Sequence, residues 1–209
     1  MSGSCGVAGL TARYDRLQDA NLMTNKVLFI QGAGTAAHKE DESLAASLQQ
    51  LLGEEYDVHF PLMQDEADAR YEVWKRQIQR EVDRLGDGII LVGHSVGASV
   101  LLKCVAEGEL KTPFAGIFLI GTPFWGGSGW TYEGYEELVL PRHMSDSVSR
   151  DAPVFLYHSR DDEVVPFAHL ASYAEALSRA TVRELDPPRG HQLNSDLSEV
   201  AADIKHLPR

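Results

Sequence analysis

Residues 88–106 constrain the fold of this chain more than any other stretch. Residues 88–92 (Gly-Ile-Ile-Leu-Val) form a short, β-branched apolar run of the kind that is buried as a strand in a parallel sheet. Residues 98–106 have the composition and length of a buried helix. Only the segment Gly93-His94-Ser95-Val96-Gly97 separates the two. The stretch therefore predicts a strand, a sharp turn and a helix, in that order.

The turn has the pattern G-x-S-x-G, and its residue types have a physical reason. Gly93 and Gly97 flank the turn where a Cβ would collide with the helix or the neighbouring strand. Ser95 is expected in strained backbone geometry that exposes its hydroxyl at the N-terminus of a helix, where free N–H groups and the dipole favour a developing oxyanion. The context therefore favours a nucleophilic serine. The alternative is a glycine-rich strand-to-helix turn of some other α/β protein.

Further apolar runs alternate with helical patterns along the rest of the chain. Strands are expected at residues 27–30, 57–60, 114–120, 153–158 and 181–185, and helices at 43–52, 65–85, 167–177 and up to about 205. This alternation predicts an α/β fold, a three-layer αβα sandwich with a mostly parallel sheet of about six strands. We expect one domain over residues 26–209, preceded by a partly flexible N-terminal extension over residues 1–25.

The composition narrows the class of protein. With 44% hydrophobic and 24% charged residues it is that of an ordinary soluble globular protein. A formal net charge of −12 argues against binding to nucleic acid, to anionic membranes or to strongly anionic substrates. No apolar run approaches the ~18 residues of a membrane span, and the N-terminus lacks the features of a signal peptide. Cys5 and Cys104 suggest neither a disulfide framework nor a metal site, so we expect a cytoplasmic location.

The loop after the expected strand 27–30, Gln31-Gly32-Ala33-Gly34-Thr35, admits three interpretations. As G-x-G-x-x-A it matches part of a dinucleotide fingerprint, but the next strand ends in Phe60-Pro61 and not in the acidic residue that binds ribose. Its small residues also suit an oxyanion loop, in which a backbone N–H approaches a substrate carbonyl. The third interpretation is a tight turn without a functional role.

Residues 122–150 interrupt the alternation of strands and helices. Aromatic side chains stand between glycines here, at Phe124, Trp125, Trp130, Tyr132 and Tyr135. This composition favours a short, lid-like wall of a substrate pocket, although the rings could instead cover an edge of the sheet.

Three chemically matched residues each follow an expected strand. Ser95, the pair Asp161-Asp162 and His191 come in this order, and reactive groups in parallel sheets gather at the carboxyl ends of the strands. A serine hydroxyl needs its proton removed as it attacks, and histidine has the pKa range for that task. A carboxylate can hold the imidazole in the right tautomer. The set predicts nucleophilic catalysis by serine.

Over residues 27 to about 205 the chain resembles the α/β-hydrolase superfamily. Gly93-His94-Ser95-Val96-Gly97 matches its nucleophile elbow, and the order Ser, Asp, His is the order of its triad. The segment 158–166 is similar to the acid loop H-G-x-x-D-x-x-V-P, with Ser159 in place of the glycine, and this alignment puts the acid on Asp162. Gly190-His191 is similar to the C-terminal glycine-histidine. Gln31-Gly32-Ala33 resembles the H-G-x oxyanion loop, with Gln31 where histidine is common.

The resemblance implies a small, nearly capless serine hydrolase with no cofactor and no metal. Ser95, Asp162 and His191 would be catalytic, and the backbone N–H groups of Ala33 and Val96 would bind the oxyanion. The expected pocket residues are Gln31, Gly32, His94, Phe124, Trp125 and Trp130. We expect hydrolysis of carboxylic esters of small uncharged acyl groups through an acyl-enzyme on Ser95, by a monomer or homodimer. A thioesterase or lipase would use the same residues, and a catalytically weak binding protein could keep the same fold.

Overall fold

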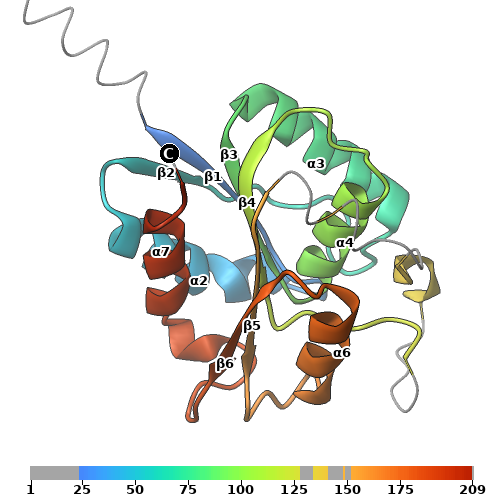
Figure 1. The fold of residues 1–209 in the computed structure, drawn as a ribbon. Coiled ribbons are helices and arrows are strands. Elements are labelled where there is room, and N and C mark those ends of the chain that lie inside the picture. The colour runs from blue at the N-terminus through green and yellow to red at the C-terminus, as the bar shows by residue number, and fades with distance from the viewer. Residues whose placement is uncertain (1–23, 128–133, 141–147, 149–151, 209) are drawn as a thin grey trace, which may run out of the picture.

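The computed structural model describes residues 24–127, 134–140, 148 and 152–208 of the chain. Six strands form one sheet in the order β2-β1-β3-β4-β5-β6, and every neighbouring pair is parallel (Figure 1). The strands are β1 (Asn25–Ile30), β2 (Tyr56–His59), β3 (Ile89–His94), β4 (Phe114–Ile120), β5 (Val154–Ser159) and β6 (Thr181–Leu185). The helices are α2 (Ala37–Leu52), α3 (Tyr71–Leu85), α4 (Ser95–Ala106), α6 (Ala168–Ala176) and α7 (Ser198–Lys205), with short 3-10 turns η1 (Glu136–Leu138) and η2 (Leu193–Ser195).

The sheet separates two hydrophobic cores, one on each face. Strand residues alternate between them, so that Leu28 and Ile30 of β1 join one core while Val27 and Phe29 join the other. The first core contains side chains of α3, α4 and α6, and the second those of α2 and α7. Figure 1 shows these helices on opposite sides of the sheet. The predicted three-layer αβα fold is therefore confirmed.

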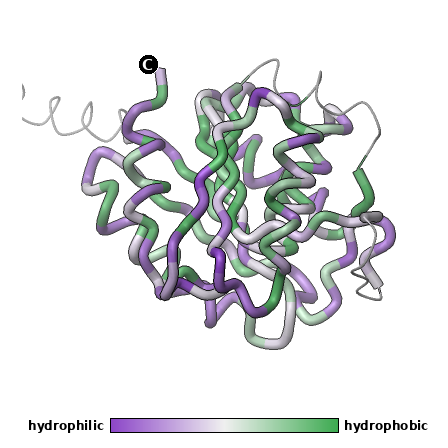
Figure 2. Tube along the Cα trace, turned by 60° about the horizontal axis from the view of Figure 1, so that its bottom comes forward, coloured by the Kyte–Doolittle hydropathy of each residue, from purple (hydrophilic) through white to green (hydrophobic). Residues whose placement is uncertain are grey.

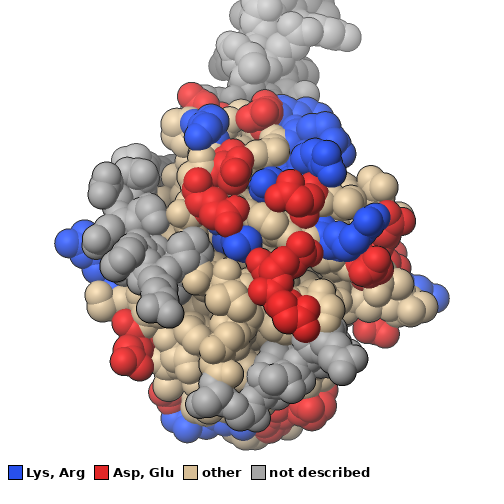
Figure 3. Space-filling model, turned by 90° about the vertical axis from the view of Figure 1, so that its right-hand side faces the viewer, with Lys and Arg blue, Asp and Glu red and all other residues tan. Residues whose placement is uncertain are grey.

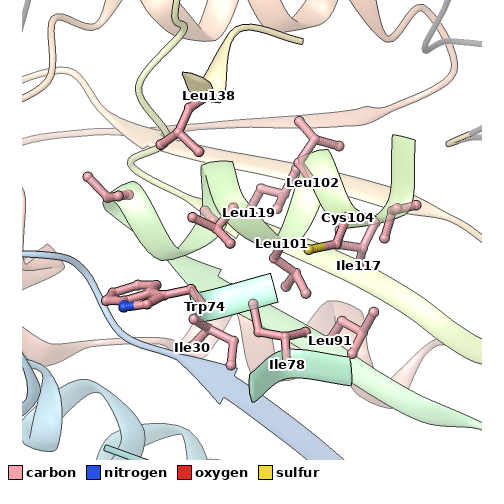
Figure 4. Close-up of a cluster of buried hydrophobic side chains, with 14 of the residues drawn as sticks. Ile30, Trp74, Ile78, Leu91, Leu101, Leu102, Cys104, Ile117, Leu119 and Leu138 are labelled. Atoms are coloured by element: carbon pink, nitrogen blue, oxygen red, sulfur yellow. The ribbon is translucent and has the colours of Figure 1, made fainter. Parts of the chain in front are cut away.

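The first core depends on the apolar stripe of α3. Its buried side chains, Tyr71, Trp74, Ile78 and Val82, recur at helical spacing. Figure 4 shows Trp74 and Ile78 among side chains of the neighbouring strands and of α4. In Figure 2 the hydrophobic stretches run through the central strands, whereas hydrophilic and hydrophobic stretches alternate along the outer helices. The core thus holds α4, which begins at Ser95, firmly against the sheet.

Two helices begin about six residues away from their predicted starts. The helix expected at 43–52 begins at Ala37, and the helix expected from Asp65 begins only at Tyr71. The reason lies in Glu66, whose carboxylate accepts hydrogen bonds from the backbone N–H groups of Ala36 and His38. An acid from outside the helix thus satisfies the N-terminus of α2, and residues 64–67, which carry Glu66, form a turn.

The helices, the surface and the undescribed residues bear on the remaining sequence features. Among the described residues, no helix combines the length and the apolar character needed to cross a membrane. On the face in Figure 3, acidic and basic side chains stand interspersed. Residues 1–23 of the expected extension over residues 1–25 and the predicted pocket residue Trp130 lie outside the described residues, and Asn25 already belongs to β1.

Candidate active site

The turn between β3 and α4 has the strained backbone geometry that the sequence predicts for Ser95, although Ser95 is only 8% exposed. Ser95 has a φ of 52°, in the left-handed region that serine rarely adopts. A Cβ on Gly93 would lie 2.6 Å from the Cα of Ala98, and a Cβ on Gly97 would lie 2.0 Å from the carbonyl oxygen of Gln31. Both glycines are therefore required by close approach of the backbone.

The imidazole of His191 contacts the carboxylate of Asp162. Nδ1 of His191 lies 2.8 Å from Oδ2 of Asp162. The other oxygen of Asp162 accepts the backbone N–H groups of Val164 and Val165 at 2.9 and 2.8 Å. Burial raises the pKa of Asp162, but hydrogen bonds from His158 and His191 outweigh that effect and hold the pKa well below its usual range. Asp162 is therefore ionised at neutral pH, and its charge faces the imidazole.

The acids on either side of Asp162 bind the backbone of the histidine loop and not the ring. Asp161 accepts hydrogen bonds from the backbone N–H groups of Arg189 and Gly190. Glu163 accepts the backbone N–H of His191 at 3.1 Å. Three consecutive carboxylates thus hold the loop before and at His191, and only the middle one contacts the imidazole.

The ring of His191 lies next to Gly121, which directly follows β4. β4 is the neighbour of β3, the strand that leads to Ser95. β3 and β4 pair in register up to His94 and Ile120, so Ser95 and Gly121 are the residues that directly follow two neighbouring strands. A Cβ on Gly121 would lie 3.3 Å from the ring of His191. Gly121 thus makes room for the imidazole next to the turn that carries Ser95.

Burial and a neighbouring imidazole lower the pKa of His191. The side chain is 9% exposed. Burial has the largest effect, the positive charge of His94 adds to it, and the hydrogen bond to Asp162 opposes both. The net pKa lies below the ordinary histidine value, which keeps the ring neutral, as a base requires.

A cavity of about 290 Å³ opens beside Ser95. Among the described residues it is lined by Ser95 and Val96 of the turn, and by Ala33, Gly34, Ala67, Asp68, Pro123, Trp125, Gly134, Tyr135, Val164 and Val165. Ala33, Val96 and Ser95 therefore line the same cavity. Within the described residues, no group of three or more His, Cys, Asp or Glu side chains could hold a metal ion.

The comparisons with known proteins decide the family. The family model described as "Serine hydrolase" matches residues 45–196. The chain belongs to the serine hydrolase family. No curated protein matches the sequence.

Solved structures confirm the α/β-hydrolase fold of this serine hydrolase. The ydeN gene product from B. subtilis superposes with a TM-score of 0.67 at 20% identity, over 87% of this chain and 97% of that one. The esterase domain of a Rhodothermus marinus protein gives 0.60 at 18% identity, over 86% and 82% of the two chains. The 2-hydroxy-6-oxo-6-phenylhexa-2,4-dienoate hydrolase from Rhodococcus sp. strain RHA1 gives 0.67 at 17% identity, over 87% and 89%.

In this serine hydrolase, four of the predicted pocket residues are not among the residues that line the cavity. Gln31 is fully buried, with its amide bonded to Glu66 and to the backbone of Met63. The Phe124 ring packs edge-on against Tyr173. Gly32 and His94 both contact the carboxylate of Asp41. Trp125 does line the cavity.

The described part of the aromatic segment forms a cavity wall that is tied to the core. Trp125 Nε1 donates to the Ser99 hydroxyl at 2.9 Å, and that hydroxyl donates to the Pro123 carbonyl. The rings of Trp125 and Tyr135 lie 5.1 Å apart. Leu138 of η1 is fully buried in the first core. These contacts tie the wall formed by Trp125 and Tyr135 to the core.

Sequence reasoning missed Asp41, which is 1% exposed and contacts three segments around Ser95. The signal was present, because Asp41 falls four residues after Ala37 and three before Leu44 on the buried face of α2. A charged residue at a core position of an amphipathic helix indicates a buried partner.

Proposed function

We propose that this serine hydrolase cleaves carboxylic esters of small uncharged acyl groups through an acyl-enzyme on Ser95. The observation that carries the proposal is the contact between Nδ1 of His191 and the carboxylate of Asp162. This pair lies next to the turn of Ser95, whose backbone is strained and which lines a cavity. Because Nδ1–H donates to the carboxylate, Nε2 keeps the lone pair that accepts the proton of the Ser95 hydroxyl.

The reaction balances with these groups alone. The Ser95 oxygen attacks the ester carbonyl as its proton passes to His191, and the resulting imidazolium gives that proton to the leaving alcohol. Water then attacks the acyl-serine, again losing a proton to His191, and releases the carboxylic acid with regeneration of the serine. Asp162 stabilises the imidazolium in both halves.

The oxyanion would be bound by the backbone N–H groups of Ala33 and Val96. Val96 stands in the first turn of α4, where helical N–H groups have no helical acceptor. The N–H groups on either side of Ala33 are both used, since Gly32 donates to Asp41 and Gly34 donates to the Glu66 carbonyl. This arrangement supports Ala33 as the donor that faces the cavity, and each such donor is worth about 3 kcal/mol of barrier.

The cavity supports the proposed substrate class. Its described lining is mainly small or apolar, and the charged residue within it is an acid, Asp68. No lysine or arginine among the described lining residues would receive an anionic acyl group. A space of about 290 Å³ favours short acyl chains.

The experiment compares neutral acyl esters of graded chain length with matched thioesters, lactones and a dicarboxylic half-ester. We expect the short neutral esters to be hydrolysed fastest and Ser95→Ala to lower kcat by about 10³-fold or more. A preference for thioesters or long chains would favour the thioesterase or lipase alternatives. Absence of hydrolysis with every substrate class would contradict the proposal and favour a binding protein.

A further inference from the structure

Asp41 is a buried carboxylate that the proposed reaction does not use. It projects from α2 and is 1% exposed. Its Oδ2 accepts the backbone N–H of Gly32 at 2.8 Å and lies 2.9 Å from Nδ1 of His94, and its Oδ1 accepts Nε2 of Gln192 at 3.0 Å. A charge removed from water this completely is costly unless it is paired and hydrogen-bonded. Its partners therefore matter to both stability and function.

Each partner of Asp41 is the sequence neighbour of a residue in the proposed mechanism. Gly32 precedes Ala33, His94 precedes Ser95, and Gln192 follows His191. These residues belong to three segments that are far apart in the chain. One carboxylate thus joins the oxyanion loop, the serine turn and the histidine loop.

The surroundings of His94 require both ring nitrogens to be donors. Nδ1 faces the carboxylate of Asp41, and Nε2 lies 3.2 Å from the carbonyl oxygen of His191. Both oxygens only accept hydrogen bonds, and a neutral imidazole has a single N–H. Only the imidazolium satisfies both contacts.

We propose that Asp41 and a protonated His94 form a buried ion pair that positions Ala33, Ser95 and His191 and disfavours protonation of the His191 ring. The effect of the ion pair on catalysis rests on the proposed function, whereas the existence of the ion pair does not depend on it. Asp41 and His94 are positioning residues, because they act through their neighbours.

The charges around the pair agree with this assignment. His94 faces Asp41 from α2, and the carboxylate of Asp162 also acts on it from a greater distance. Burial lowers the pKa of His94, but Asp41 outweighs burial and the net pKa is raised. The rings of His94 and His191 have centroids 4.7 Å apart, so a positive His94 disfavours a second positive charge on His191. The carboxylate of Asp41 acts on the pKa of His191 in the opposite direction, but its effect is smaller than that of His94.

The ion pair is tested directly by the ¹⁵N NMR signals of the imidazoles in the Ser95→Ala variant, whose readout does not need activity. We expect both ring nitrogens of His94 to carry protons at pH 7.5, and Asp41→Asn to convert the ring to a neutral tautomer. A neutral His94 at pH 7.5 in the Ser95→Ala protein with Asp41 intact would overturn the proposal.

The catalytic consequence is tested by kcat/KM against pH for Asp41→Asn, Asp41→Ala and His94→Gln. The asparagine can keep the hydrogen bonds without the charge, since the Oε1 atom of Gln192 is buried and unpaired and its amide can turn over. Glu42→Gln is the matched control, because Glu42 is the exposed neighbour on the same helix.

The acid limb of kcat/KM follows the protonation of His191, and both variants remove the positive charge of His94. We therefore expect the limb to move to higher pH in Asp41→Asn. In His94→Gln the negative charge of Asp41 remains without its partner, and we expect a shift to higher pH of about one unit. Asp41→Ala should in addition lower the plateau by about 100-fold, with recovery of most of it in Asp41→Asn. Unmoved limbs in Asp41→Asn and His94→Gln would overturn the electrostatic role. Plateaus equal to that of Glu42→Gln in all three variants would overturn the positioning role. An inactive parent protein would instead refute the proposed function.

Discussion

Replacing Gly97 by alanine tests whether the serine turn depends on contact with the loop after β1. The added Cβ would lie 2.0 Å from the carbonyl oxygen of Gln31 and 2.9 Å from Cγ2 of Ile30. Carbon and oxygen atoms this close must separate by about 1 Å, so either α4 or the loop has to move. Overpacking of this kind costs about 3 kcal/mol, which corresponds to a Tm lower by roughly 6–12 °C for a domain of this size.

The same displacement would separate Ser95 from Ala33, because the clash lies between their two segments. A misplacement of about 1 Å costs about 100-fold in kcat/KM. Thermal unfolding and ester hydrolysis would be measured beside Gly116→Ala in β4, whose Cβ would lie 3.2 Å from side-chain atoms of Leu207 and Phe118, so that a shift of a few tenths of an ångström in side chains is enough. We expect that control to stay within about 2 °C of the parent protein. A Gly97→Ala variant as stable and active as the control would refute the reasoning.

Three further predictions concern the site. Asp162→Asn should lower kcat by about 10⁴-fold, whereas Asp161→Asn leaves the contact with the imidazole in place and should lower kcat by about tenfold. Equal losses of kcat in steady-state assays of the two variants would contradict this division of roles. Burial and the charge of His94 lower the pKa of His191, so the neutral base persists at lower pH and kcat/KM should rise through a midpoint below pH 6.5; a midpoint above that value would speak against the assignment. Trp125→Phe removes the bond to Ser99 but keeps an aromatic wall, so KM should rise about threefold to tenfold with little change in kcat, and a loss confined to kcat would argue against a role in binding.

Most of the fold could be predicted from the sequence because its signals are local. The all-apolar runs at 27–30, 88–92 and 114–120 are strands buried on both faces, and the stripe from Tyr71 to Val82 is the buried face of α3. Helix starts were less predictable. α2 begins at Ala37 because Glu66, from a distant segment, satisfies its N-terminus.

Some features of the candidate site could likewise be predicted from the sequence, and others could not. The pairing of Asp162 with His191 could be predicted, because the resemblance of residues 158–166 to the acid loop of the α/β-hydrolases puts the acid on Asp162 and not on Asp161. The cavity lining could not, since whether Gln31 points into the cavity or towards Glu66 depends on packing between segments 35 residues apart. Asp41 had a sequence signal in its helical spacing, but its three partners are set only by the tertiary fold.

The central claim, that His191 activates the Ser95 hydroxyl, is tested most directly by labelling with a fluorophosphonate followed by intact-mass and peptide analysis. We expect one adduct on Ser95 in the parent protein, and labelling slowed by about 10³-fold or more in His191→Gln. Equal labelling rates in the two proteins, or an adduct on another residue, would contradict the account.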